Sequence, residues 1–433
     1  MAKDKMRELL FKVITNLGFK GFSVVLALAM QVMMARWLTP AEYGQFALMQ
    51  VIAVGLATFA QAGMLNAYMK LVSELDDLYG VYAISKVCFR ICVRHLGISV
   101  LCFALVSGLL HYFGKVESVI VLSMFSAYMV FQAFIMLLLA WYRGINKAYI
   151  SSFLEQGSFA GLTVVFGFCW MWYYQAPWGL NTASAAFLIA IALVSLAAVW
   201  PVFIRVSSHK KDVFEPDTAR IKQLSKRFLT MQMAAYMANW GGVLVVGFLL
   251  AVDQVAELNI AQRLAQVVVF FLMAFNGVIA PLFAKLNAQG DHAALRKLAQ
   301  RSALLLTVAT IPVVIAAVFF GETLLAVFGP QYVDAYSILL ILMIGQFINA
   351  LTGSVGFLLN MTDHEQVMRN IVIISCVVTM IVSVAATWVF GIIGAACAVT
   401  LGLAINNFTA AFYVYKHLGF VTIPGLQWVG SNK

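Results

Sequence analysis

The chain has 433 residues, of which 63% are hydrophobic and only 11% are charged, and its formal net charge is +10. This composition excludes a soluble protein of this length, because too few polar side chains remain to cover its surface. A basic nucleic-acid-binding module is excluded as well, since no stretch of the chain can form a soluble basic face. We therefore expect an all-α integral membrane protein whose solvent is the phospholipid bilayer and which has no nucleic-acid partner.

Charge-free hydrophobic runs, each near the roughly 20 residues that a helix needs to cross a bilayer, recur along the whole chain. Those of the first half predict helices at 13–35, 43–69, 87–112, 119–142, 151–174 and 183–204. Those of the second half predict helices at 228–251, 258–284, 302–321, 335–360, 370–390 and 394–415. We thus predict about 12 transmembrane helices in an N-terminal lobe (1–204), a cytoplasmic linker (205–227) and a C-terminal lobe with a short cytoplasmic tail (228–433).

The basic residues alternate between the two sides of the predicted membrane protein. With the N-terminus in the cytoplasm, segments on the inner side hold 24 of the 28 basic residues, and only Arg36 and Lys115 lie on the outer side. Short cytoplasmic loops retain Lys and Arg during insertion, so we expect both termini in the cytoplasm. A shift of about 215 residues places Gln61 on Asn276 and Gln132 beside Gln346, which indicates a parallel repeat of six helices.

Three ionisable residues fall inside predicted helices, where a charge is costly and usually faces protein or a water-filled cavity. Lys20 and Arg263 are candidates to bind substrate in a central cavity, although either could instead snorkel to the membrane surface. Glu155 is a candidate for ion coupling, and the alternative is a simple pair with Arg143 or Lys147. Two cations and one acid suit an anionic substrate better than a cationic one.

Amide side chains accompany these charges within the predicted helices. Their alternative role is hydrogen bonding between helices, which contributes roughly 0.6 to 2 kcal/mol per contact in membranes. The candidates to bind substrate are Gln61, Gln132, Asn239, Gln262, Gln266, Asn276, Gln346 and Asn349.

The sequence contains no pattern that indicates an enzyme, a metal site or a resident cofactor. The six cysteines form no CxxC pair, the six histidines are scattered, and no GxxxxGK[ST] nucleotide loop occurs. A polymerase, ligase or acyltransferase of the membrane would need a large outer loop or a grouped set of catalytic side chains, whereas the predicted outer loops are short. We expect a transporter without catalytic residues, driven by a coupling ion that the sequence leaves open, such as a proton or sodium.

Three stretches resemble the polysaccharide-exporter branch of the multidrug/oligosaccharidyl-lipid/polysaccharide (MOP) flippase superfamily. The first is ARWLTPAEYGQFAL, similar to the family's junction between helices 1 and 2. The second is LNIAQRLAQVVVFFLMAFNGVIAPLFAKLNAQGD, similar to helix 8 of the family. The third is FGPQYVDAYSILLILMIGQFINALTGSVGFLLNMTDHEQ, similar to helix 10 and the loop before it.

The resemblance implies two six-helix lobes around a central cavity, in the MOP/MATE-like arrangement, and a flippase of the bacterial inner membrane. Its implied cargo is an undecaprenyl pyrophosphate-linked oligosaccharide, such as an O-antigen unit of lipopolysaccharide biosynthesis. A polymerase and a chain-length regulator are the implied partners.

The resemblance also bears on single residues. Arg263 matches a helix-8 arginine of the related lipid II flippases, whereas Met30 and Gln31 replace arginines that this branch carries in helix 1. This departure argues against a peptidoglycan precursor as cargo. The main alternative function is a cation-coupled multidrug extruder of the same fold, and only Glu155 offers the acid that such a protein needs.

Overall fold

A computed structural model of the chain describes residues 2–73, 78–144, 147–207 and 216–423, and all regular structure in these ranges is helical. The described chain divides into two compact units, Met1–Met233 and Ala234–Lys433. The division falls inside one continuous helix, α9 (Thr218–Leu249). Its first half therefore belongs to the first unit and its second half to the second.

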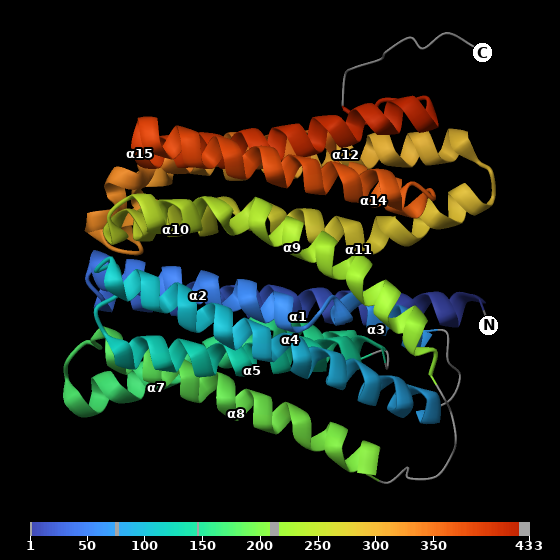
Figure 1. Ribbon diagram of the computed structural model, residues 1–433. Helices are drawn as coiled ribbons and strands as arrows, with labels where there is room; N and C mark the ends of the chain where they lie inside the picture. The colour runs from blue at the N-terminus through green and yellow to red at the C-terminus, as the bar shows by residue number, and fades with distance from the viewer. Residues whose placement is uncertain (1, 74–77, 145–146, 208–215, 424–433) are drawn as a thin grey trace. The chain divides into compact units, whose positions relative to one another are not determined.

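Within the first unit, the long helices run side by side along one direction (Figure 1). They are α1 (Ala2–Trp37), α2 (Pro40–Ala60), α3 (Met64–Ser73), α4 (Leu78–Tyr112), α5 (Val119–Gly144), α6 (Ala148–Ser152), the π-helical turn η1 (Phe153–Gly157), α7 (Ser158–Tyr174) and α8 (Leu180–Ser207). The quoted junction stretch explains the start of α2: Thr39 and Glu42 form a capping box, and Pro40 occupies the first helical turn.

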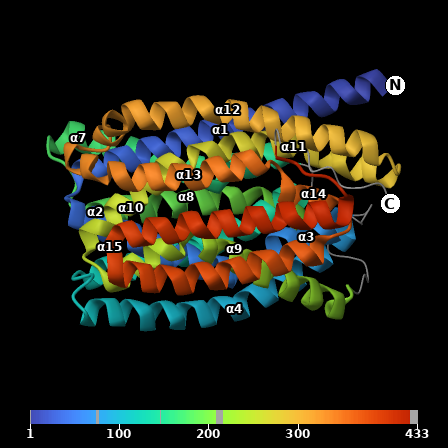
Figure 2. The ribbon, with the colours of Figure 1, turned by 90° about the horizontal axis from the view of Figure 1, so that it is seen from above.

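The second unit follows the same plan, and its helices also run side by side (Figure 2). After the second half of α9 come α10 (Val252–Ala265), α11 (Val267–Ala288), α12 (His292–Ala326), the short 3₁₀ helix η2 (Pro330–Ala335), α13 (Tyr336–Thr352), α14 (Val355–Met361) and α15 (Glu365–Leu418). Gly391, with φ +62°, divides α15 into two legs that pack against each other. No loop separates the two legs, because glycine adopts this backbone conformation without steric cost.

Nine helical stretches of the described chain are long and apolar enough to cross a membrane. One of these stretches, α15, has two legs and so counts as two crossings. The broken helices α6–α7 (148–174) and α10–α11 (252–288) add one crossing each, which gives about 12. The expected all-α membrane fold with about 12 helices is thus confirmed. The chain is a multi-pass membrane protein.

The observed helices differ from the predicted ones mainly at their ends and in their continuity. Helix α9 begins at Thr218, inside the segment predicted as a linker, and residues 208–215 of that segment lie outside the described residues. The predicted helices 43–69, 258–284 and 335–360 are each interrupted: after Ala60, at Gln266 and after Thr352. These interruptions were not predicted, because a hydrophobic run does not reveal where its backbone bends.

The first half of α9 supplies hydrogen-bond partners to the interruption after Ala60. Ala62 and Gly63 have φ of +54° and +70°, so the backbone here leaves the helical path. The hydroxyl of Ser225 donates to the carbonyl of Ala62 at 2.6 Å, and Gln61 Nε2 donates to Gln232 Oε1 at 2.9 Å. Because broken backbone must be satisfied by protein at membrane depth, α9 supplies the partners that this turn needs.

Candidate functional site

A cluster of three charged side chains lies inside the first unit. Glu155 Oε2 is 3.1 Å from Arg143 Nη2 and 3.6 Å from Lys20 Nζ, so one carboxylate oxygen serves two cations. Arg143 Nε also donates to Ser151 Oγ at 2.8 Å. The predicted pairing of Glu155 with Arg143 is confirmed, and Lys20 joins the same pair. The cluster has a formal charge of +1.

The π-helical turn η1 brings these charges together. Its last residue, Gly157, lies so close to Ser23 of α1 that a Cβ at this position would come within 2.5 Å of Ser23 Oγ. The Ser23 hydroxyl lies within hydrogen-bonding distance of the Ser152 carbonyl at 3.0 Å, just before the turn. Such single π turns are frequent at functional sites, because the extra residue re-aims the neighbouring side chains. Here α1 approaches closely enough for Lys20 to reach Glu155.

The two candidate amides of the first unit have different surroundings. Gln61 occupies the interruption between α2 and α3, where its Oε1 accepts from the backbone N–H of Leu65 at 3.2 Å while its Nε2 binds Gln232. Gln132 is buried in α5 and accepts a hydrogen bond from the Tyr128 hydroxyl at 3.3 Å. Gln61 thus satisfies a broken helix, which is a structural task.

In the second unit, Arg263 lies near the end of α10 and is held by neutral groups. Its Nε donates to Asn259 Oδ1 at 2.9 Å, one turn earlier on the same helix. Its guanidinium lies 5.4 Å from the centre of the Trp240 ring on α9, which is a cation–π distance. Both contacts stabilise the charge while leaving it uncompensated by these two partners. Asn259 and Trp240 were not among the predicted site residues.

Three predicted amides surround this arginine in sequence and in space. Gln262 Nε2 donates to the carbonyl of Asn239 on α9, which joins the two helices. Gln266 is the residue at which α10 ends and α11 begins, so the helix is interrupted three residues after Arg263. Gln262 Oε1 is buried and has no hydrogen-bond partner among the described residues. An interrupted helix beside a cation is a typical binding element of membrane transporters.

The remaining candidates of the second unit lie on two further helices. Gln346 and Asn349 contact each other on α13 through an amide pair at 3.4 Å, and α13 packs directly against α10. Asn276 on α11 is buried, and its Oδ1 has no partner in the described part of the chain. The structure therefore places the second-unit candidates on the packed helices α9, α10, α11 and α13.

Sequence reasoning identified most of these residues and missed their partners. The sequence places Arg143 at a helix end, as an alternative partner of Glu155. In the structure, Arg143 and Lys20 both contact Glu155 and both belong to the cluster. Trp240 was missed because an aromatic residue in a membrane helix is ordinary. Within the described residues, no group of three or more His, Cys, Asp or Glu side chains can hold a metal ion.

Comparison with known proteins adds independent findings. The sequence profile of a family described as "Polysaccharide biosynthesis protein" matches residues 33–337. A curated relative, the "Probable low-salt glycan biosynthesis flippase Agl15" of Haloferax volcanii, is 23% identical over 290 residues, or 64% of this chain. The chain spans 61% of that relative's length.

Solved structures share the fold at low sequence identity. An inward closed structure of the lipid II flippase MurJ superposes with a TM-score of 0.71 at 15% identity, covering 93% of this chain and 87% of that one. An inward-facing multidrug resistance MATE transporter of the MOP superfamily gives the same TM-score and identity, with 94% and 98% covered. Since a flippase and a drug transporter fit equally well, the fold alone does not choose between these activities.

Proposed function

The chain belongs to the polysaccharide biosynthesis protein family, and from this premise we propose that it is a lipid-linked oligosaccharide flippase. Its cargo is an undecaprenyl pyrophosphate-linked repeat unit, such as an O-antigen unit for lipopolysaccharide or a related surface polysaccharide. It moves this unit from the cytoplasmic to the periplasmic leaflet of a bacterial inner membrane by alternating access. Both termini are cytoplasmic in this proposal, and the protein acts as a transporter rather than an enzyme.

The observation that carries the proposal is the cluster of Lys20, Arg143 and Glu155. Two cations at the ends of candidate membrane spans share one carboxylate oxygen, and an unpaired charge near the hydrocarbon core is expensive. A pyrophosphate carries more negative charge than a single carboxylate, so it can take over one or both cations when it arrives. The carboxylate thus holds the site in a stable state until the anionic cargo replaces it.

Arg263 and its neighbouring amides support the same function from the second unit. A guanidinium beside an amide oxygen and an aromatic face is a charged donor that suits a phosphate or an acidic sugar. Gln262 Oε1 and Asn276 Oδ1 offer hydrogen-bond acceptors to sugar hydroxyls. These amides are our candidates to bind the sugars of the cargo.

Glu155 is also our candidate for coupling transport to an ion. A proton or sodium ion bound at this carboxylate would weaken its hold on Lys20 and Arg143 and so make both available to the cargo. A gradient of either ion could then drive the cycle without a bound cofactor. A polymerase and a chain-length regulator that use the exported units are the proposed partners.

The competing function, a cation-coupled drug extruder, is disfavoured by the same cluster. A cationic drug needs an acid that is free to bind it, whereas Glu155 already contacts two cations. Expression of the protein in a dye-sensitive strain tests this alternative directly. We expect no protection against cationic dyes.

Purified protein in proteoliposomes provides the decisive test. We expect a fluorescent undecaprenyl pyrophosphate oligosaccharide to reach the opposite leaflet faster than in protein-free vesicles, as measured by quenching with an added membrane-impermeant reagent. Deletion of the gene should abolish surface polysaccharide and accumulate the lipid-linked unit inside the cell. Unchanged surface polysaccharide in the deletion strain, together with no movement in vesicles, would contradict the proposal.

A further inference from the structure

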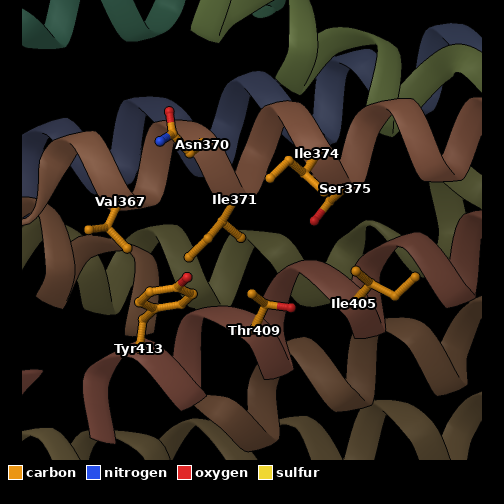
Figure 3. Close-up of a pocket in the computed structure, with 8 residues that line it drawn as sticks. All are labelled: Val367, Asn370, Ile371, Ile374, Ser375, Ile405, Thr409 and Tyr413. Carbon is orange, nitrogen blue, oxygen red and sulfur yellow. The ribbon is translucent and has the colours of Figure 1, made fainter. Parts of the chain in front are cut away.

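A pocket of about 170 Å³ lies between the two legs of α15, within the second unit (Figure 3). It is distinct from the candidate site on α9, α10, α11 and α13. Its lining comes from the beginning of the first leg and the end of the second: Val367, Asn370, Ile371, Ile374, Ser375, Ile405, Thr409 and Tyr413. The pocket therefore lies toward the end of α15 at which its first residue, Glu365, and its last, Leu418, are found.

The pocket forms because the two legs of α15 touch at Gly402 and Thr379 but lie further apart toward the ends of the helix. A Cβ on Gly402 would collide with the Thr379 side chain, so the legs touch at this level. One turn closer to the helix ends, Ser375 faces the branched side chain of Ile405, and no glycine allows a comparably close approach. Figure 3 shows Thr409 and Tyr413 of the second leg pointing toward Ile371 and the first leg across the resulting space.

The pocket wall combines an apolar lining with polar groups that are available for binding. Val367, Ile371, Ile374 and Ile405 supply the apolar surface. Among the described residues, the side-chain amide of Asn370 and the hydroxyls of Thr409 and Tyr413 make no hydrogen bonds within the protein. Such a wall suits a ligand with a hydrocarbon part and a polar head.

A lysine and two histidines lie at the pocket mouth. Lys416 Nζ lies 5.6 Å from the centre of the Tyr413 ring, and the His417 ring stacks on Tyr413 with centroids 5.9 Å apart. His417 is in turn 4.4 Å from His364, the residue that precedes α15. This arrangement places one lysine and two titratable imidazoles around the tyrosine that closes the pocket.

The chain at and just before the start of the first leg carries charges of both signs. Arg369 precedes the pocket residue Asn370 in the chain. The two acids nearby in sequence are Asp363, which accepts a hydrogen bond from Asn287 at 3.2 Å, and Glu365 in the first turn of α15. Lys416 contacts the pocket residue Tyr413 directly, whereas Asp363 is engaged by Asn287.

We propose that this pocket binds an anionic phospholipid of the surrounding bilayer. Its phosphate contacts Tyr413, Asn370 and Lys416, and the first part of one acyl chain lies along Ile371, Ile374 and Ile405. Basic pockets between transmembrane helices at a membrane surface bind anionic lipid headgroups in this way. The lipid is a structural and regulatory ligand of the second unit, separate from the cargo of the proposed flippase.

Native mass spectrometry of the purified full-length chain tests the proposal with phosphatidylglycerol and phosphatidylcholine of identical acyl chains. We expect the wild-type protein to retain phosphatidylglycerol preferentially. Ile374→Trp fills the pocket and should reduce retained phosphatidylglycerol by about tenfold. Ile381→Trp is the matched control, because Ile381 is on the same leg, is not a pocket residue and is as exposed as Ile374, at 65% against 62%. It should leave retention unchanged.

A charge variant tests the headgroup contact separately. Lys416→Gln should lower the preference for phosphatidylglycerol over phosphatidylcholine by about fivefold, the effect of one basic residue near a membrane surface. Lys297→Gln on α12, also exposed, is its control. If Ile374→Trp fails to fold, Tyr413→Phe combined with Lys416→Gln takes its place.

Three results would overturn the proposal. The first is equal retention of both phospholipids by the wild type, and the second is wild-type retention by the pocket-filling variant. The third is displacement of phosphatidylglycerol by an equal concentration of undecaprenyl phosphate, which would make the pocket a site for the lipid carrier. Each result is independent of whether transport of the oligosaccharide is observed.

Discussion

The two units stabilise their partly buried cations in different ways. In the first unit, Lys20 and Arg143 share the carboxylate of Glu155, so charge is balanced by charge. In the second unit, Arg263 contacts an amide oxygen of Asn259 and the ring of Trp240. Buried ion pairs are sensitive to the loss of one partner, whereas neutral partners lose only a hydrogen bond or a ring contact.

This difference predicts that the two units contribute differently to stability and to transport. In the first-unit cluster both cations already contact Glu155, so an arriving anion must displace this carboxylate to bind. The second unit keeps two acceptors without partners in the described chain, Gln262 Oε1 on α10 and Asn276 Oδ1 on α11. We therefore expect the first unit to respond to mutation in stability and transport together, and the second mainly in transport.

Glu155→Gln should have the largest effect. It removes the carboxylate and leaves Lys20 and Arg143 as two adjacent, uncompensated cations, so transport should fall by about 100-fold and the melting temperature should fall as well. Transport in proteoliposomes and thermal unfolding in detergent measure the two effects. Glu117→Gln, at an exposed acid of the same unit, is the control. Normal transport and stability of Glu155→Gln would remove the contrast between the units.

Gly63→Ala should destabilise the first unit by about 2 kcal/mol, because residue 63 has a left-handed backbone conformation and an added Cβ would collide with α9. A Cβ at this position would lie 2.6 Å from the carbonyl oxygen of Ser225. Gly97→Ala is the matched control, since no heavy atom lies within 4 Å of its added Cβ. Thermal unfolding compares them, and equal melting temperatures would show that α9 does not fix this turn.

Arg263→Ala should lower transport by about tenfold and change the melting temperature less than Glu155→Gln does, because its contacts with Asn259 and Trp240 are with neutral groups. Arg263→Lys keeps the charge and should retain most of the transport. Arg296→Ala, at an exposed arginine of α12, controls for a general loss of positive charge. Full transport by Arg263→Ala at normal protein levels would exclude a role for this charge.

Gln262→Leu should have the smallest effect. It removes an acceptor that has no partner among the described residues and also the hydrogen bond from Nε2 to the Asn239 carbonyl, so the melting temperature should fall slightly, while transport falls by about threefold through one lost contact to a sugar hydroxyl. Gln132→Leu is the comparison, because Gln132 already binds Tyr128 within the protein. A loss of stability in Gln262→Leu without a loss of transport would assign this amide to helix packing.

The sequence predicted the helices well because the bilayer imposes their length. All twelve predicted helices have observed counterparts, but α1, α4 and α12 extend well beyond the hydrophobic runs that predicted them. Their ends carry charged residues that leave the hydrocarbon core, and hydropathy cannot assign such residues to helix or loop. The start of α9 at Thr218 has the same cause.

The candidate site was predicted in composition but not in geometry. Lys20, Glu155 and Arg263 are conspicuous because ionisable residues are rare in hydrophobic runs. The π-helical turn that joins Lys20 to Glu155 depends on the close approach of Gly157 to Ser23, residues 134 positions apart in the chain. Single-sequence patterns do not encode such distant contacts, and the partner Trp240 of Arg263 was missed for the same reason.

The bond from Ser225 to the carbonyl of Ala62 bears on how the protein can be made and divided. A fragment that ends at residue 207 would contain the whole interruption between α2 and α3 but none of the residues of α9 that close it. Its exposed carbonyl would then face lipid, at a cost of several kcal/mol. The first lobe is therefore complete only when the chain has been synthesised past Gln232, and co-expressed halves should rejoin through the first turns of α9.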